Sequence, residues 1–157
     1  MITIQTREWF DKQNGNSYFS AKVHLGNDLI MSLPFQYGYG GARQEVENRL
    51  AKHFGTCAER WELRDLLRQN GIEISESKTN SLKRNLSKES FEDFTPFLKP
   101  ENLAKYAYYR MQNNVNVICN GEEYFIQAIV APESLVLEFG HAYEPIEMCK
   151  TTELNWF

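Results

Sequence analysis

The residues best suited to chemistry gather at one junction, Leu33–Arg43, whose sequence is LPFQYGYGGAR. Glycine-rich turns at helix starts expose backbone amides, which attract phosphate and other anions. This glycine spacing fits neither GxGxxG nor the P-loop pattern, which needs Lys and Ser or Thr after its last glycine. We therefore interpret the stretch as a tight turn from a strand into a helix. Tyr37, Tyr39 and Arg43 would form a partner-binding patch there, because tyrosine and arginine dominate interface energetics.

The spacing of the remaining residues gives little support for a metal site or for a catalytic site with a nucleophile. His53 and Cys57 stand four apart, which would suit a metal on one helix. Gly55 and a cap at Thr56 interrupt that helix between them. The histidines are scattered and give no Ser/His/Asp or Cys/His arrangement. We expect no metal, no cofactor and no enzymatic activity.

A basic segment over residues 61–88 is similar to a helix-turn-helix, with Gly71 between its two expected helices. The second helix would carry the nucleic-acid-binding residues, which are Lys78, Lys83, Arg84 and Lys88. The turn is long for such a motif, and Asn80 stands where an apolar residue is usual. A solvated helical connector explains the same segment. A DNA-binding regulator is therefore the alternative function.

The last third of the chain is strongly acidic. Residues 111–157 hold one basic residue, Lys150, against seven glutamates, whereas the whole chain has a net charge of −4. These glutamates form either a solubilising surface or a surface complementary to a basic, nucleic-acid-binding partner, whose association the field would steer. The predicted partner-binding residues of this region are Glu122, Glu123, Glu138, Glu144 and Glu147.

Bulk composition is that of a globular protein. The 157 residues are 42% hydrophobic and 24% charged, enough for one good core or two small ones. No apolar run approaches the roughly 20 residues that span a bilayer, and the start, MITIQTREWF, lacks the apolar region of a signal peptide. The odd, widely spaced set of three cysteines predicts free thiols in a reducing cytoplasm.

Alternation of apolar and polar residues predicts three strands at the N-terminus. An Asn-Gly turn at 14–15 would be a two-residue hairpin loop that places Ile4 opposite Leu25. A three-residue loop over 26–28 would place Leu25 opposite Leu29. The apolar members of all three strands then share one face. We expect a three-stranded antiparallel meander.

The rest of the chain predicts an α+β fold. Helices are expected over 42–54, 57–70 and 100–112, and a second antiparallel sheet over 115–149. Residues 75–90 are either a short helix or a mobile connector. The predicted domains are 1–74, a connector over 75–99 and 100–157, which could share one core. The buried face of the third helix is predicted to be Leu103, Ala104, Ala107, Tyr108 and Met111.

The stretch WFDKQNGNSYFSAKVHLGNDLIMSLPFQYGYGG, with the residues that follow it to position 43, resembles the openings of small phage and prophage proteins. Those open with a similar hairpin, a hydrophobic third strand and an LPFQYGYG turn. The resemblance implies a mobile-element origin. Small phage proteins of this kind are often inhibitors of host machinery, including anti-CRISPR proteins, which is an analogy. We therefore expect a phage-encoded, non-enzymatic protein that inhibits a nucleic-acid-handling complex in the host cytoplasm through its acidic, aromatic surface.

Overall fold

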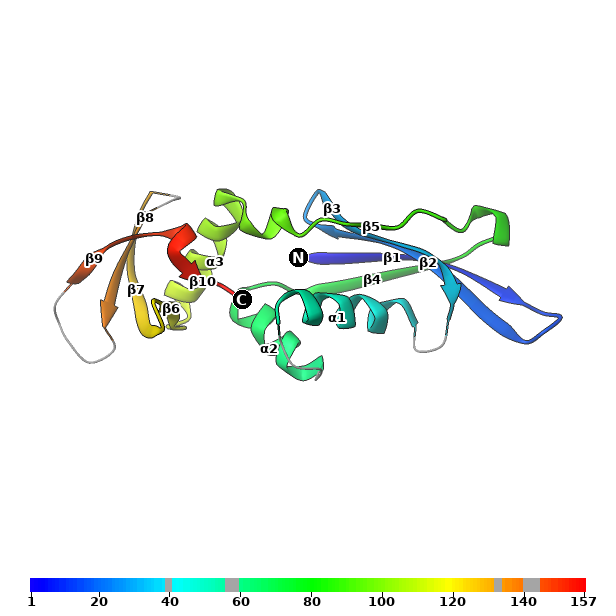
Figure 1. Cartoon of the computed structure of the whole chain (residues 1–157), viewed down its shortest axis with the longest axis horizontal. Coiled ribbons are helices and arrows are strands. Elements are labelled where there is room, and N and C mark those ends of the chain that lie inside the picture. The colour runs from blue at the N-terminus through cyan, green and yellow to red at the C-terminus, as the bar shows by residue number, and fades with distance from the viewer. Residues whose placement is uncertain (39–40, 56–59, 132–133, 140–144) are drawn as a thin grey trace. The chain divides into compact units, whose positions relative to one another are not determined.

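The computed structural model describes residues 1–38, 41–55, 60–131, 134–139 and 145–157. These residues form an α+β fold with two sheets, as predicted (Figure 1). The chain divides into two compact units, the first being Met1–Arg64 with Glu73–Pro96 and the second Asp65–Ile72 with Phe97–Phe157. Helix α2 (Arg60–Gln69) contributes residues to both units.

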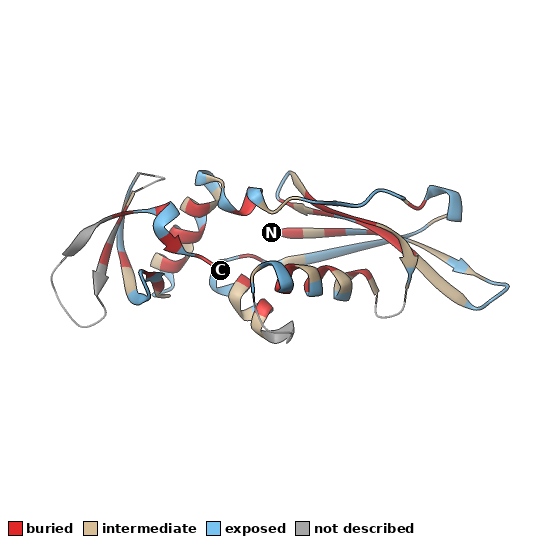
Figure 2. Ribbon diagram, viewed as in Figure 1, coloured by how far each residue is buried: buried red, intermediate tan, exposed pale blue. Residues whose placement is uncertain are grey.

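The first unit is built on a five-stranded sheet in the order β4-β1-β2-β3-β5. Its centre is the predicted antiparallel meander of β1 (Ile2–Asp11), β2 (Asn16–Leu25) and β3 (Asp28–Tyr37). Helix α1 (Gly41–His53) contacts β1 and β2. Buried positions alternate with more exposed ones over residues 2–7 of β1 (Figure 2). The core includes Ile2, Ile4, Val23, Leu33, Val46 and Leu50.

The register of the first hairpin differs from the prediction by two residues. Ile4 lies opposite Val23 instead of Leu25, because the loop has four residues, 12–15, instead of two. The carboxylate of Asp11 accepts hydrogen bonds from the amide of Gln13 and the side chain of Asn14, which stabilises this wider loop. Since a shift of two keeps every side chain on its face, the predicted core face is unaffected.

The second turn differs in part from the predicted three-residue loop. Val23 lies opposite Met31, as predicted, but Leu25 lies opposite Asp28 instead of Leu29. The loop itself has two residues, and an irregularity between Val23 and His24 moves the rest of the strand into the expected register.

The expected helix or connector over 75–90 is wrong. Ile74–Asn80 form β4, which pairs in parallel with β1, and the chain continues through a short turn, η1 (Lys83–Asn85), to β5 (Phe91–Glu92) at the opposite edge. Every β4 residue after Ile74 is exposed. An edge strand of this kind has no apolar alternation to reveal it, because backbone pairing with a neighbouring strand holds it in place.

The second unit contains helix α3 (Pro100–Gln112) and a five-stranded sheet in the order β10-β6-β7-β8-β9. Pro100 stands at the start of the helix, as predicted. Asn120 and Gly121 have φ values of 52° and 85° and form the predicted hairpin turn, with Val117 opposite Tyr124. The strands are β6 (Val117–Cys119), β7 (Glu122–Ala131), β8 (Ser134–Phe139), β9 (Pro145–Lys150) and β10 (Leu154–Asn155), with the turn η3 (Thr151–Glu153) before the last.

The buried face of α3 includes a charged residue. Tyr108 was predicted to be buried but is 58% exposed, whereas Tyr106 and Arg110 are buried beside Leu103 and Ala107. This spacing of three and four residues is that of a helical face. The predicted face included neither Tyr106 nor Arg110, so it was placed incorrectly.

Arg110 is buried because its guanidinium group bonds three separate segments of the second unit. Its Nε donates to Asn70 Oδ1 at 3.0 Å, Nη1 to the carbonyl of Asn116 at 2.6 Å, and Nη2 to the carbonyl of Trp156 at 3.3 Å. Burial lowers the pKa of Arg110 to about 10. The side chain therefore holds together the end of α2, the approach to β6 and the last residues of the chain.

Candidate functional site

Tyr37, one of the predicted partner-binding residues, lies at the end of β3 with 53% of its surface exposed. Its hydroxyl donates to Asn16 Oδ1 at 3.3 Å, and its ring meets Tyr18 edge-on at 5.7 Å between centroids. Tyr39 lies outside the described residues. The tyrosine that can be placed is thus at the surface, as a contact residue must be.

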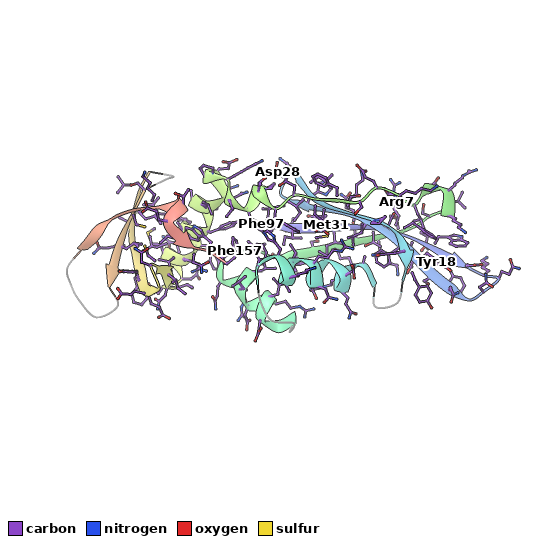
Figure 3. All side chains as sticks on the ribbon, viewed as in Figure 1. Arg7, Tyr18, Asp28, Met31, Phe97 and Phe157 are labelled. Carbon is purple, nitrogen blue, oxygen red and sulfur yellow. The ribbon has the colours of Figure 1, made fainter. Side chains whose placement is uncertain are left out.

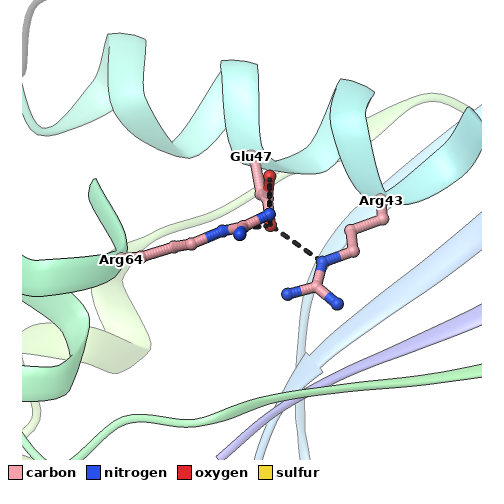
Figure 4. Close-up of polar contacts among 3 residues, drawn as sticks. All are labelled: Arg43, Glu47 and Arg64. Atoms are coloured by element: carbon pink, nitrogen blue, oxygen red, sulfur yellow. Dashed lines mark hydrogen bonds and ion pairs between the residues drawn. The ribbon is translucent and has the colours of Figure 1, made fainter. Parts of the chain in front are cut away.

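Arg43 is engaged within the first unit. Its Nε donates to the carboxylate of Glu47 one helical turn later at 2.9 Å, and Arg64 of α2 approaches the same carboxylate at 3.2 Å (Figure 4). The Glu47 side chain is fully buried, whereas the two arginine side chains are 43% and 50% exposed. Arg43 and Arg64 together compensate this buried carboxylate. Arg43 therefore has a structural task within α1, and Arg64 links α2 to α1.

The predicted acidic residues can be placed only in part. Glu122 and Glu123 are exposed at the start of β7. Glu122 accepts a hydrogen bond from the hydroxyl of Tyr124 at 3.2 Å, and Glu123 accepts one from the side chain of Asn116 at 3.0 Å. The backbones of Glu138 and Glu147 lie in β8 and β9, but their side chains and all of Glu144 lie outside the described residues.

The second helix of the predicted helix-turn-helix is wrong, because β4 occupies its first part. Lys78 lies on that strand and its Nζ is 2.6 Å from Glu8 Oε2. Lys83 lies in the turn η1, over the rings of Trp9 and Phe35 at 5.0 and 5.9 Å from their centroids. Arg84 is exposed in the same turn, and Lys88 is exposed beyond it. The four basic residues thus do not share a helical face.

The structure reveals a different constellation, on the face of the first sheet opposite its buried hydrophobic residues. The registers of β4, β1 and β2 align the outward side chains in three rows. We call this set the polar grid. Its rows are Ser75–Thr3–His24, Ser77–Gln5–Lys22 and Thr79–Arg7–Ser20. All nine side chains are polar or basic, and none is a carboxylate.

A groove of about 720 Å³ lies along the polar grid. One of its walls is the chain between β4 and β5, which several hydrogen bonds hold over the sheet. Arg7 Nη1 donates to the carbonyl of Asn85 at 3.3 Å, and the amide of Ser87 donates to Ser20 Oγ at 3.0 Å. His24 also lines the groove, and its buried ring nitrogen Nδ1 has no hydrogen-bond partner among the described residues.

An aromatic cluster continues the same face beyond the polar grid. Tyr18 stacks between Trp9 at 5.4 Å and Phe35 at 5.1 Å, and Tyr37 meets its edge. Figure 3 shows Arg7 and Tyr18 on the same stretch of the sheet. We call these four rings the aromatic cluster. The outer face thus runs from hydroxyl and amide groups through cations to aromatic rings.

Sequence reasoning missed this face, although part of its signal was present. Thr3, Gln5 and Arg7 alternate with the apolar residues of β1, as Ser20 and Lys22 do in β2. The third column needed β4, which was not predicted as a strand. Without it the polar residues formed two ordinary outward rows instead of a continuous surface.

In the described ranges, no group of three or more His, Cys, Asp and Glu side chains is placed to hold a metal ion. None of the helices that can be described has both the length and the apolar character needed to cross a bilayer. Comparison with known proteins gave no matching family model, no matching curated protein and no matching solved structure.

Proposed function

We propose that this chain is a phage-encoded, non-enzymatic binding protein that inhibits a host nucleic-acid-handling complex by occupying part of its surface. The observation that carries the proposal is the aromatic cluster, because its member Tyr37 is 53% exposed beside three further rings. Surface tyrosine and tryptophan side chains supply much of the binding energy at protein interfaces.

Two further features support this function. The resemblance to phage proteins begins at Trp9 and so covers the end of β1 and all of β2 and β3, which together carry the aromatic cluster. Glu122 and Glu123 are exposed, and they belong to the segment 111–157, which contains seven glutamates and one lysine. An acidic surface of this kind favours fast association with the basic surface of a nucleic-acid-binding protein.

The test is recovery of a host complex with tagged protein expressed in a bacterial host. We expect Tyr37→Ala to reduce the recovered complex strongly, and Glu122→Lys/Glu123→Lys to reduce it in a salt-dependent manner. Tyr108→Ala is the matched control, because Tyr108 is 58% exposed and belongs to α3 of the second unit, whereas the aromatic cluster belongs to the first.

Inhibition is measured in the same strains as restored plaque formation by a phage that the host system normally restricts. Equal recovery and equal inhibition by the Tyr37→Ala protein and the unaltered protein would overturn the assignment of the aromatic cluster as the contact.

A further inference from the structure

We propose that the groove over the polar grid binds single-stranded nucleic acid through its phosphodiester backbone. The proposal goes beyond the function proposed above and does not depend on it, because it concerns the purified chain alone and different side chains. The ligand class follows from the charge, the donor groups and the size of the groove.

The charge of the groove is purely positive. Arg7 and Lys22 lie diagonally across the neighbouring strands β1 and β2. Arg7 is paired with Ser20, and Ser20 lies two residues before Lys22 on β2. Diagonal neighbours are about 7 to 8 Å apart, so one phosphate group can contact both cations. None of the residues that line the groove is acidic, and neither cation has an ion-pair partner among the described residues.

The two faces of the same strands differ in how their charges are used. On the buried side Lys78 is paired with Glu8 at 2.6 Å, so that cation is already compensated. On the outer side the cations are exposed and uncompensated. A solvated sheet face normally mixes both signs of charge, so this segregation indicates an anionic ligand.

Neutral donors surround the cations. Gln5 lies between Ser77 and Lys22, and Thr79 lies beside Arg7, all lining the groove. Hydroxyl and amide groups bond phosphate and sugar oxygens in nucleic-acid complexes without reading the sequence. The groove therefore offers the contacts that follow a sugar–phosphate chain.

Size and continuation favour a single strand over a duplex. A groove of about 720 Å³ admits groups of nucleotide size, whereas a duplex presents its phosphates on a stiff, convex surface. The wall of the groove continues into Lys83, Arg84 and Lys88, and the aromatic cluster follows along the sheet. A basic groove beside aromatic rings is the usual arrangement of single-strand binding proteins.

The test is fluorescence anisotropy of labelled oligothymidine and oligouridine, each of about 20 nucleotides, titrated with the full chain in about 50 mM salt. Arg7→Gln/Lys22→Gln should weaken binding about tenfold or more and lower the slope of log affinity against log salt by about 1.4, or about 0.7 per lost contact. The matched control is Lys52→Gln/Lys105→Gln, which removes the same charge from two exposed helical lysines and should change affinity less than about twofold.

Thermal melting of both double variants verifies that they are folded, since all four side chains are exposed. Two results together support the proposal. Binding is weakened in Arg7→Gln/Lys22→Gln but not in the control, and the unaltered chain binds single strands more tightly than a duplex of the same length. Absence of binding, equal weakening by the control, or preference for the duplex overturns it. The proposal is also overturned if Arg7→Gln/Lys22→Gln no longer recovers a host protein but still binds the oligonucleotides as tightly as the unaltered chain. The groove would then be a protein contact.

Discussion

The Sγ atoms of Cys119 and Cys149 lie 3.5 Å apart, although their strands β6 and β9 are not neighbours in the second sheet. The single turn η3 joins β9 to β10, which pairs with β6 at the other edge, so the two edges must curl toward each other. Both thiols are free and buried. The pair therefore reports on whether the sheet is closed.

The first prediction concerns alkaline pH. Burial, with contributions from Cys119 and Glu153, raises the pKa of Cys149 from 9.0 to about 12. In the unfolded chain this thiol loses its proton near pH 9, so between pH 9 and 12 the folded state holds a proton that the unfolded state has released. The free energy of unfolding should be unaffected by this group below pH 9 and fall as the pH rises toward 12.

Urea unfolding at several pH values measures this dependence. Burial also raises the pKa of Tyr106 and lowers that of Arg110, so these groups contribute to the pH dependence as well. The unaltered chain and Cys149→Ala both contain them, so the slopes of unfolding free energy against pH are compared between these two proteins. The variant should lose less stability per pH unit above pH 9. Identical slopes would show that Cys149 is not buried.

The second prediction concerns the buried carboxylate of Glu47. Glu47→Ala should lower the free energy of unfolding by about 2 kcal/mol, less than the 3–5 kcal/mol typical of a broken buried pair, because Arg43 and Arg64 are half exposed and regain water. Arg64→Ala should cost less, since Arg43 still compensates the carboxylate. Chemical denaturation measures both, and a larger loss in Arg64→Ala than in Glu47→Ala would contradict this account.

The third prediction concerns the turn between β3 and α1. Gly41 has a φ of +80°, so Gly41→Ala should cost about 1 kcal/mol through backbone strain. A Cβ at Gly38 would lie 2.9 Å from the carbonyl oxygen of Ser17, so Gly38→Ala should also destabilise. Tyr37→Ala should stay within about 0.5 kcal/mol, as exposed substitutions do. Melting temperatures check all three, and unfolding of Tyr37→Ala would make that ring a core residue.

The fourth prediction concerns Arg110. Arg110→Lys keeps the charge but replaces a planar fork by a single ammonium that cannot reach three acceptors at once. We expect a loss of about 2–4 kcal/mol, because oxygens of Asn70 and Asn116 lose the guanidinium donor and the carbonyl of Trp156 keeps only its bond from Asn70. Arg68→Lys is the control, with 78% of its side chain exposed, and should have almost no effect. Equal urea midpoints for the two variants would refute the structural role of Arg110.

Local signals predicted the fold where one short segment decides the structure. The Asn120-Gly121 turn has both residues at positive φ, and Pro100 begins its helix. Gly71 follows α2 with φ of +66°. In each case the conformational preference of a few consecutive residues decides the local structure, so the sequence is sufficient to predict it.

Long-range pairing could not be predicted in the same way. The strand β4 is polar throughout after Ile74 and exists because β1 offers it a free edge 72 residues earlier in the chain. Arg110 is buried because Asn70 and Trp156 arrive from distant segments. The polar grid depends on the first of these pairings, so the candidate site was out of reach although two of its three columns were visible.

The order in which the first sheet is completed has a consequence for synthesis. The outer edges of β1 and β3 are covered by β4 and β5, which leave the ribosome after both helices of the region. For several seconds of translation, the nascent meander carries two bare rows of backbone donors and acceptors. Such edges pair readily with a second chain. A transcript broken before codon 74 would therefore yield a fragment that aggregates, and the cell would dispose of it.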